Sequence, residues 1–251
     1  EKTGANIFYQ ETKGKGSAIL ENIHQIPAEV VVLIDGDGTY EGPALEQLVE
    51  PILKLRADMV VSTRFEKMEP GAMSPFNKFG NWTFRTILGT YGIKIQDMLS
   101  GYRSFRKSKF MDLALDNVSF EIETYLTSEA LRHKWRILEI PLPYYRRKGK
   151  TKLNPLRDGW LILRAIVTML IRLKPLPFFS SLSAVLLLLS IYPSALVIYE
   201  KIAFGEIEHQ ASVTLAAFLI LTAAQFFFFG VRMQLQLASM DHLERLIKRI
   251  K

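Results

Sequence analysis

The sequence predicts an α/β domain followed by an amphipathic interfacial helix and a two-helix transmembrane hairpin. Three observations support this prediction. Short apolar runs alternate with helical patterns over residues 1–150. A strongly basic block follows them, and two long uncharged apolar stretches come after it. The mean hydropathy of +0.11 beside 23% charged residues is therefore an average over two unlike regions.

The strand-like segments of the first region are rich in β-branched residues. They are Ala5–Gln10, Glu29–Ile34, Asp58–Thr63 and Arg136–Ile140. Helical patterns lie between and after them, at Ser17–Gln25, Pro43–Arg56, Pro75–Leu88 and Phe120–His133. Pro43 suits the first turn of its helix. Strands that alternate with helices are typical of a mainly parallel sheet, which we expect here.

Two stretches without a formal charge carry most of the excess hydrophobicity, Leu176–Tyr199 with 24 residues and Ala211–Val231 with 21. As helices they would be about 36 and 32 Å long, enough to cross a bilayer core of about 30 Å. A pair of buried core helices is the alternative, which two such runs in tandem disfavour. The loop Glu200–Gln210 is too short to hold a domain, so the pair predicts a hairpin.

Basic residues flank this pair on its outer ends. Residues 132–174 carry 12 basic and 2 acidic side chains, residues 175–231 carry 1 and 3, and residues 232–251 carry 5 and 2. The positive-inside rule therefore places both termini in the cytoplasm and the acidic loop outside. We expect the basic block to face anionic lipid headgroups. A nucleic-acid patch is the alternative, but the adjacent membrane segments disfavour it, and we expect no nucleic-acid partner.

These patterns divide the chain into four regions. The α/β domain covers residues 1–153, the amphipathic interfacial helix 154–174, the hairpin 175–232 and a cytoplasmic helix 233–251. The last region places Met240, Leu243, Ile247 and Ile250 at helical spacing. This spacing fits either the seam of a homo-oligomer or a helix lying on a membrane or protein surface.

The motif most informative about chemistry is DGDG at residues 35–38, directly after an apolar strand. Ligands of open α/β sheets bind at the carboxyl ends of strands. Asp35 and Asp37 can converge there on a hard divalent cation such as Mg²⁺, which takes other oxygens from water and substrate phosphates. An EF-hand is excluded because Tyr40 stands where that loop requires glycine. A polar turn without a ligand is the other interpretation of the tetrapeptide alone.

Other kinds of site lack the residues they need. The chain has no cysteine, which excludes a disulfide framework, a thiolate zinc site and a cysteine nucleophile. The four histidines are scattered without ligand spacing, and no Walker loop GxxxxGK[ST] occurs. Lys13 and Lys15, in KGKG before a helix, either bind phosphate with nearby backbone N–H groups or form a solvated turn.

Further motifs follow DGDGTY in a fixed order: QDMLSGYRSFRK at 96–107, FEIETYLTSEALRHKWRILEIPLPYYRRKGKTKLN at 120–154, an amphipathic helix and the hairpin. This set resembles the inverting glycosyltransferases of family 2, in the polyprenyl-phosphate branch similar to dolichol-phosphate mannose synthase. The resemblance implies a GT-A (Rossmann-like) fold, a UDP- or GDP-hexose donor, Mg²⁺ or Mn²⁺, and a polyprenyl phosphate acceptor. The implied activity is metal-dependent transfer of a hexose to undecaprenyl or dolichyl phosphate, at the cytoplasmic face of the plasma membrane. The product would be a lipid-linked sugar donor for glycan assembly.

The resemblance also implies roles for particular residues. Asp35 and Asp37 would hold the metal on the donor diphosphate, with Thr39 beside it and Lys13 and Lys15 as further donor-binding candidates. Asp97 would lie near the sugar, where it could orient a hydroxyl or an arginine, accept a proton, or form a structural ion pair with Arg103. The residues implied for the acceptor phosphate are Arg85, Arg103, Arg106, Arg147 and Lys150. Lys152 belongs to the same basic stretch as Arg147 and Lys150, at the membrane-facing end of the site. A solvated surface charge is the alternative for each of these basic residues.

The sequence departs from the family at its beginning. Relatives start with a strand, a helix and a second strand that hold the base and ribose of the donor. This chain begins after that unit, so we expect an N-terminally incomplete domain.

Two other functions remain open. One is a glycosyltransferase acting on another membrane acceptor such as a glycolipid, whose hydroxyl would need a base and would make Asp97 more important. The other is a non-catalytic membrane-anchored scaffold, which would need none of these motifs. A processive synthase is disfavoured because only two spans are predicted.

Overall fold

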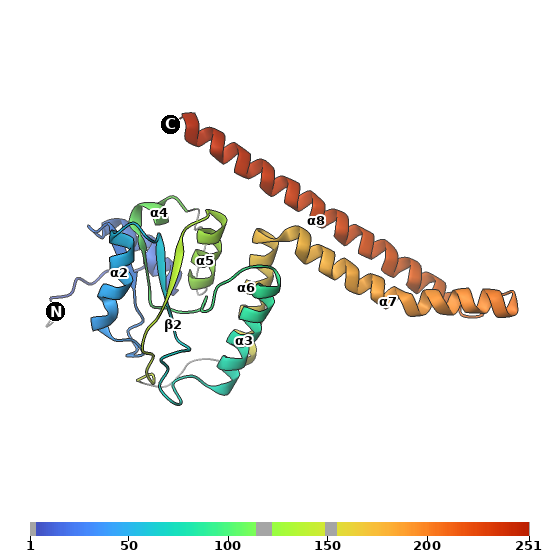
Figure 1. Cartoon of the computed structure of the whole chain (residues 1–251), viewed down its shortest axis with the longest axis horizontal. Helices are drawn as coiled ribbons and strands as arrows, with labels where there is room; N and C mark the ends of the chain where they lie inside the picture. The colour runs from blue at the N-terminus through green and yellow to red at the C-terminus, as the bar shows by residue number, and fades with distance from the viewer. Residues whose placement is uncertain (1–3, 114–121, 149–154, 251) are drawn as a thin grey trace. The chain divides into compact units, whose positions relative to one another are not determined.

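The computed structural model describes residues 4–113, 122–148 and 155–250. The chain divides into two compact units, residues 1–169 and residues 170–251 (Figure 1). The first unit is an α/β domain and the second is a pair of long helices, as the sequence predicts.

The first unit is built on a sheet whose strands lie in the order β1-β3-β2-β4. They are β1 (Val30–Leu33), β2 (Met59–Thr63), β3 (Arg103–Arg106) and β4 (Ile137–Pro141). β2 and β4 are parallel, but β3 is antiparallel to both of its neighbours. The expectation of a mainly parallel sheet is therefore wrong. β3 begins at the edge of the sheet where β1 and β2 end, so it has to run back between them.

Residues 5–10 correct a second expectation. They form no strand, and the side chains of Ile7, Phe8 and Tyr9 are exposed. In the described parts of the chain, β1 pairs with β3 and with no other strand. An apolar run becomes a strand only when a neighbour satisfies its backbone groups, and residues 5–10 have none here.

The predicted helices of the first unit are confirmed, with small differences at their ends. Their bounds are α1 (Lys15–Asn22), η1 (Ile23–Gln25), η2 (Gly42–Ala44), α2 (Leu45–Leu53), α3 (Pro75–Thr90), α5 (Ile122–Arg132) and α6 (Pro155–Leu173), with a short unpredicted helix, α4 (Lys107–Met111). α3 shows why the start of a helix is predictable. Pro75 occupies its first turn and Ser74 caps it by accepting a hydrogen bond from the Asn77 N–H at 3.2 Å.

Both faces of the sheet are buried. Along β2, Met59 and Val61 enter one apolar cluster with Phe105 and Leu126, while Val60 enters the other with Leu48, Ile52 and Tyr102. Alternate side chains of a strand point to opposite faces, so β2 contributes to both clusters. This two-sided packing fixes the strand ends from which the candidate site is built.

The second unit consists of α7 (Pro175–Phe204) and α8 (Gln210–Ile250), and residues 233–250 continue α8 without a break. Each helix contains a segment long and apolar enough to cross a membrane. The two pack closely where Phe179 meets Phe229 at 4.8 Å between ring centroids. A Cβ on Gly230 would lie 2.9 Å from the Cβ of Phe179, so glycine permits this contact. The buried Glu200 closes the connecting loop by accepting the backbone N–H groups of Glu208 and His209 at 3.1 Å each.

Candidate active site

The DGDG turn lies at the carboxyl end of β1, as predicted. Asp37 Oδ1 accepts two hydrogen bonds from Thr39, one from its backbone N–H at 3.1 Å and one from its hydroxyl at 2.6 Å. An aspartate side chain commonly stabilises a turn by accepting a hydrogen bond from the backbone two residues later. Gly38 has a φ of 76°, which favours glycine. Thr39 is buried, so its hydroxyl holds the Asp37 carboxylate in one orientation.

The loop 97–101, which carries the SGYR motif, packs directly against this turn. A Cβ on Gly101 would lie 2.1 Å from Asp35 Oδ2, so a side chain here would displace the carboxylate. The hydroxyl groups of Tyr40 and Ser100 are 3.2 Å apart and join the same two segments. The two motifs, which are distant in the sequence, thus form one site.

Each carboxylate of the turn has a cationic partner. Lys15, at the first residue of α1, places its Nζ 2.5 Å from both Asp35 Oδ1 and Glu123 Oε1. Burial opposes the charge of Lys15, but Glu123 and Asp35 outweigh it and raise the pKa of the ammonium group. Arg147 Nε lies 3.2 Å from Asp37 Oδ2. The turn is therefore a partly exposed acidic centre held by two cations.

The acidic centre fits a hard divalent cation. Among the described residues, no group of three or more His, Cys, Asp or Glu side chains is arranged to hold a metal. Two carboxylates suffice, however, where a cation keeps water and substrate phosphates as its other ligands. The side chains of Asp35 and Asp37 are 36% and 19% exposed, so these ligands could reach them. Their pairing with Lys15 and Arg147 shows that the turn attracts positive charge.

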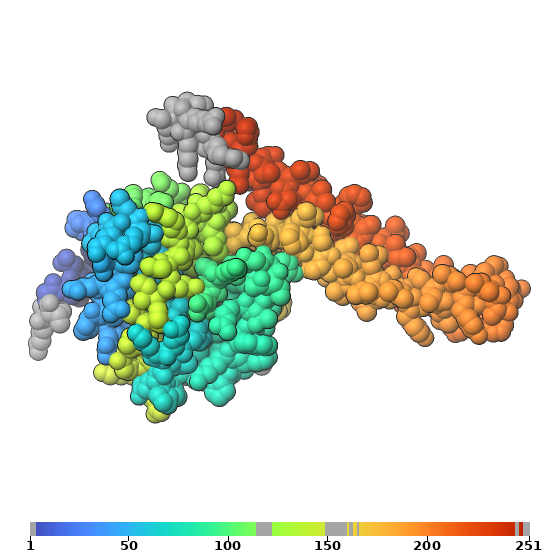
Figure 2. Space-filling model, viewed as in Figure 1, coloured from blue at the N-terminus to red at the C-terminus, as the bar shows by residue number. Residues whose placement is uncertain are grey.

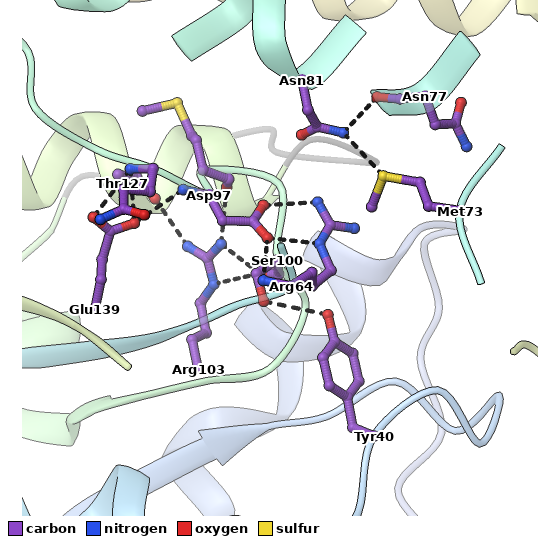
Figure 3. A network of polar contacts seen from close by, with 12 residues as sticks. Tyr40, Arg64, Met73, Asn77, Asn81, Asp97, Ser100, Arg103, Thr127 and Glu139 are labelled. Carbon is purple, nitrogen blue, oxygen red and sulfur yellow. Dashed lines mark hydrogen bonds and ion pairs between the residues drawn. The ribbon is translucent and has the colours of Figure 1, made fainter. Parts of the chain in front are cut away.

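Asp97 is fully buried and belongs to a polar network with Arg64 and Glu139 (Figure 3). Its carboxylate accepts three hydrogen bonds from Arg64, at 3.0 Å from the backbone N–H and at 2.7 Å from both Nε and Nη2. Burial opposes the charge of Arg64, but Asp97 outweighs it and raises the pKa of the guanidinium. The ion-pair partner of Asp97 is thus Arg64, where the sequence had suggested Arg103.

Glu139, in β4, is hydrogen-bonded to the backbone of the loop that carries Asp97. Its carboxylate accepts the backbone N–H groups of Gln96 and Asp97 at 2.8 and 2.9 Å. Burial raises the pKa of Glu139. The start of the loop is therefore fixed to the sheet at its backbone as well as through the Asp97 side chain.

Arg103 has no exposed surface, and hydrogen bonds occupy all of its donors. An arginine side chain has five N–H donors. Here they go to the carbonyls of Met98, Glu123 and Ser100, which accepts two, and to the hydroxyl of Thr127, at 2.5 to 3.0 Å. This arrangement leaves no donor for a lipid phosphate. Arg103 instead ties loop 97–101 to α5.

Arg106 lies away from the acidic centre. It pairs with Val30 at the beginning of β1, whereas the DGDG turn follows the end of that strand. Its Nη2 donates to the carbonyl of Ile52 at 2.9 Å. The structure does not bring it together with Asp35 and Asp37, so the phosphate role that the sequence suggested for Arg106 does not agree with its position.

The other residues singled out in the sequence are placed as follows. Arg85 is exposed on α3 and Lys13 is exposed before α1. Lys150 and Lys152 fall outside the described residues. Sequence reasoning missed Arg64 and Glu123. Arg64 directly follows β2, as Asp35 follows β1, so its place at a strand end could have identified it.

Several known proteins are similar to this chain. The family model for glycosyl transferase family 2 matches residues 1–114. Glycosyltransferase AglJ of Haloferax volcanii is 32% identical over 235 residues, which cover 92% of this chain and 77% of that protein. The dolichyl-phosphate hexose transferase of the same organism is 31% identical over 170 residues, covering 66% and 72%. Glucosyl-3-phosphoglycerate synthase of Mycobacterium tuberculosis, solved with Mn²⁺ and UDP-glucose, has 18% identity and a TM-score of 0.48, covering 67% of this chain and 56% of that chain.

Proposed function

This chain belongs to glycosyltransferase family 2, in the polyprenyl-phosphate branch, and from that premise we propose that it transfers a hexose from a UDP- or GDP-sugar to a polyprenyl phosphate. The observation that carries the proposal is the meeting of the DGDG turn with loop 97–101, beside Lys15 and Arg147. The two membrane-length helices of the same chain provide the setting for a lipid acceptor.

The donor diphosphate is assigned to the acidic centre. Asp35 and Asp37 would hold Mg²⁺ or Mn²⁺, which when bound offsets the charge that develops on the leaving nucleoside diphosphate. Lys15, whose Nζ lies 2.5 Å from Asp35 Oδ1, would contact oxygens of the donor diphosphate. Thr39 keeps the Asp37 carboxylate oriented.

The burial and hydrogen bonding of Asp97 bear on which kind of acceptor the site would use. A phosphomonoester has a second pKa of about 6 and is mostly a dianion at neutral pH, so it needs positioning more than a general base. Asp97 is buried and held by three hydrogen bonds from Arg64, which suits a positioning role. This arrangement favours a phosphate over a hydroxyl nucleophile. In-line attack at the anomeric carbon would invert its configuration.

The acceptor phosphate would be bound by basic residues. We assign this role to Arg147, whose Nε lies 3.2 Å from Asp37 Oδ2, with Arg85 and Lys150 as further candidates. Arg103 contributes indirectly, because it holds the loop that places Gly101 against Asp35. We assign the domain to the cytoplasmic side of the plasma membrane, since basic residues flank the hairpin on its outer ends.

A transfer assay tests the proposal directly. Membranes containing the chain are incubated with a panel of labelled nucleotide sugars and polyprenyl phosphate, and label is measured in the organic phase. Label should appear there with one donor and only when polyprenyl phosphate is present. Transfer to a glycolipid without polyprenyl phosphate would instead support the hydroxyl-acceptor alternative.

Gly101→Ala should reduce transfer by roughly a hundredfold, because misplacing a site group such as the Asp35 carboxylate by about 1 Å can have an effect of this size. The new Cβ would overlap the Asp35 carboxylate. Initial rates measured at saturating donor and acceptor would show the loss. Gly42→Ala is the matched control, since a Cβ at Gly42 would meet no atom within 4 Å. Equal rates for the two variants would contradict the close contact.

The loop between α7 and α8 should face away from the cytoplasm. The chain lacks cysteine, so Glu206→Cys, at an exposed loop position, introduces a single thiol. A membrane-impermeant maleimide should label it from the outside of intact cells. The exposed Glu46→Cys in α2 should be labelled only after permeabilisation. Labelling of Glu206→Cys from the cytoplasmic side alone would disprove the orientation.

A further inference from the structure

Helix α3 carries an aromatic face that the fold of its unit does not bury. The face consists of Phe76, Phe79 and Trp82, whose exposed fractions are 55%, 64% and 55%. The rings of Phe79 and Trp82 lie 5.9 Å apart, so the face is continuous over at least part of its length. Figure 2 shows the green α3 surface on the outside of the first unit. Exposed aromatic clusters of this kind usually mark an interaction surface.

The core of the unit uses the other side of the same helix. Phe84 and Leu88 point into it, with exposed fractions of 4% and 0%. At 3.6 residues per turn, the aromatic face lies nearly opposite these two residues. Packing within the unit therefore does not account for the three large exposed rings. A partner outside the unit, such as a protein or a membrane surface, would cover them.

The charges of α3 favour a membrane surface as this partner. The helix contains no acidic residue, and its exposed basic residues, Lys78 and Arg85, lie along one edge of the aromatic face. Aromatic side chains bordered by basic ones are typical of helices that lie in the headgroup layer of anionic membranes. The chain itself reaches a membrane, because α7 and α8 are long and apolar enough to cross one.

We propose that α3 docks on the anionic membrane surface, with its aromatic face in the headgroup layer and Lys78 and Arg85 at lipid phosphates. This docking depends on the chain being in a membrane and does not depend on the transfer reaction.

The inner side of α3, which carries Phe84 and Leu88, faces the rest of the first unit. Asn77 and Asn81 lie on this side, and Asn81 Nδ2 donates to the Asn77 carbonyl at 2.8 Å (Figure 3). A helix with its side chains is about 10 Å across. A docked α3 would therefore hold its inner side about one helix diameter from the headgroup layer.

A fluorescent label on the aromatic face tests the docking in the full chain. Phe79→Cys creates a single thiol for the environment-sensitive dye NBD, and Phe76 and Trp82 stay in place. The chain is reconstituted in vesicles of phosphatidylcholine and phosphatidylglycerol. We expect a blue-shifted emission that spin-labelled lipid quenches and aqueous iodide does not. Met111→Cys in α4 is the matched control, because Met111 is 53% exposed, and its dye should show the opposite behaviour.

Two outcomes would overturn the proposal. Quenching by iodide alone would show that the face is in water, and protection from both quenchers would show that protein, such as a second copy of the chain, covers it. A charge-reversed variant with Lys78→Glu and Arg85→Glu should lose most of the lipid quenching, as should vesicles of phosphatidylcholine alone. Lipid quenching that is unchanged in both would disprove the electrostatic part. The dye reports docking whether or not the chain transfers sugar. A negative transfer assay would therefore contradict the proposed function without contradicting the docking of α3.

Discussion

Asp35→Asn and Asp37→Asn should each nearly abolish sugar transfer and leave the fold intact. Each variant removes one of the two charged oxygen ligands that the turn offers a divalent cation. Charge stabilisation by such a cation contributes several kcal/mol, so we expect a loss of roughly a hundredfold to a thousandfold. Both side chains are partly exposed and face the site, so neither change should unfold the domain. Initial transfer rates over a range of Mn²⁺ and Mg²⁺ concentrations would measure the effect.

Two controls make this result specific. Asp112→Asn, at an exposed position after α4, changes the same charge away from the site and should keep the wild-type rate. Excess chelator should stop transfer by the unaltered chain, and added Mn²⁺ or Mg²⁺ should restore it. Retention of the wild-type rate by either turn variant, or activity in excess chelator, would disprove the metal assignment.

The parts of the fold that were predicted correctly carry their own local signal. The helices after Ser74 and Pro43 have capping or first-turn residues, and the two membrane-length helices are defined by the absence of charge. Strand β3 has no such signal, because RSFR is short and half of it is arginine. Its direction depends on where loop 97–101 delivers the chain. Residues 5–10 show the converse, since their apolar pattern is correct but no strand within the described residues pairs with them.

The same distinction applies to the candidate site. Asp35 and Asp37 could be predicted because a strand end places them at a ligand-binding edge. The burial of Arg103 could not, because arginine is rarely fully buried and its partners are mostly backbone carbonyls. Carbonyl positions are set by the tertiary fold and leave no trace in the sequence. Motif resemblance therefore identified the loop that matters but gave Arg103 a different contact from the one observed.

Asp97→Ala should be the most destabilising single change in the site. It would leave the guanidinium of Arg64 buried without its carboxylate, and breaking a buried ion pair costs about 3–5 kcal/mol. For a chain of this size the melting temperature should fall by roughly 6–20 °C, as measured by thermal unfolding in detergent micelles. Glu50→Gln is the matched control. It breaks the exposed pair of Glu50 and Lys54 in α2 and should change stability by less than about 0.5 kcal/mol.

A double-mutant cycle separates the ion pair from simple loss of packing. Once Asp97 is alanine, Arg64→Met removes an unpaired buried charge, so it should restore part of the stability. In the unaltered background the same change leaves Asp97 unpaired and should be destabilising. Opposite signs in the two backgrounds require direct coupling between the two side chains, whereas additive effects would contradict it. Transfer should not recover with stability in the double variant, because the network that positions loop 97–101 against Asp35 would still be missing.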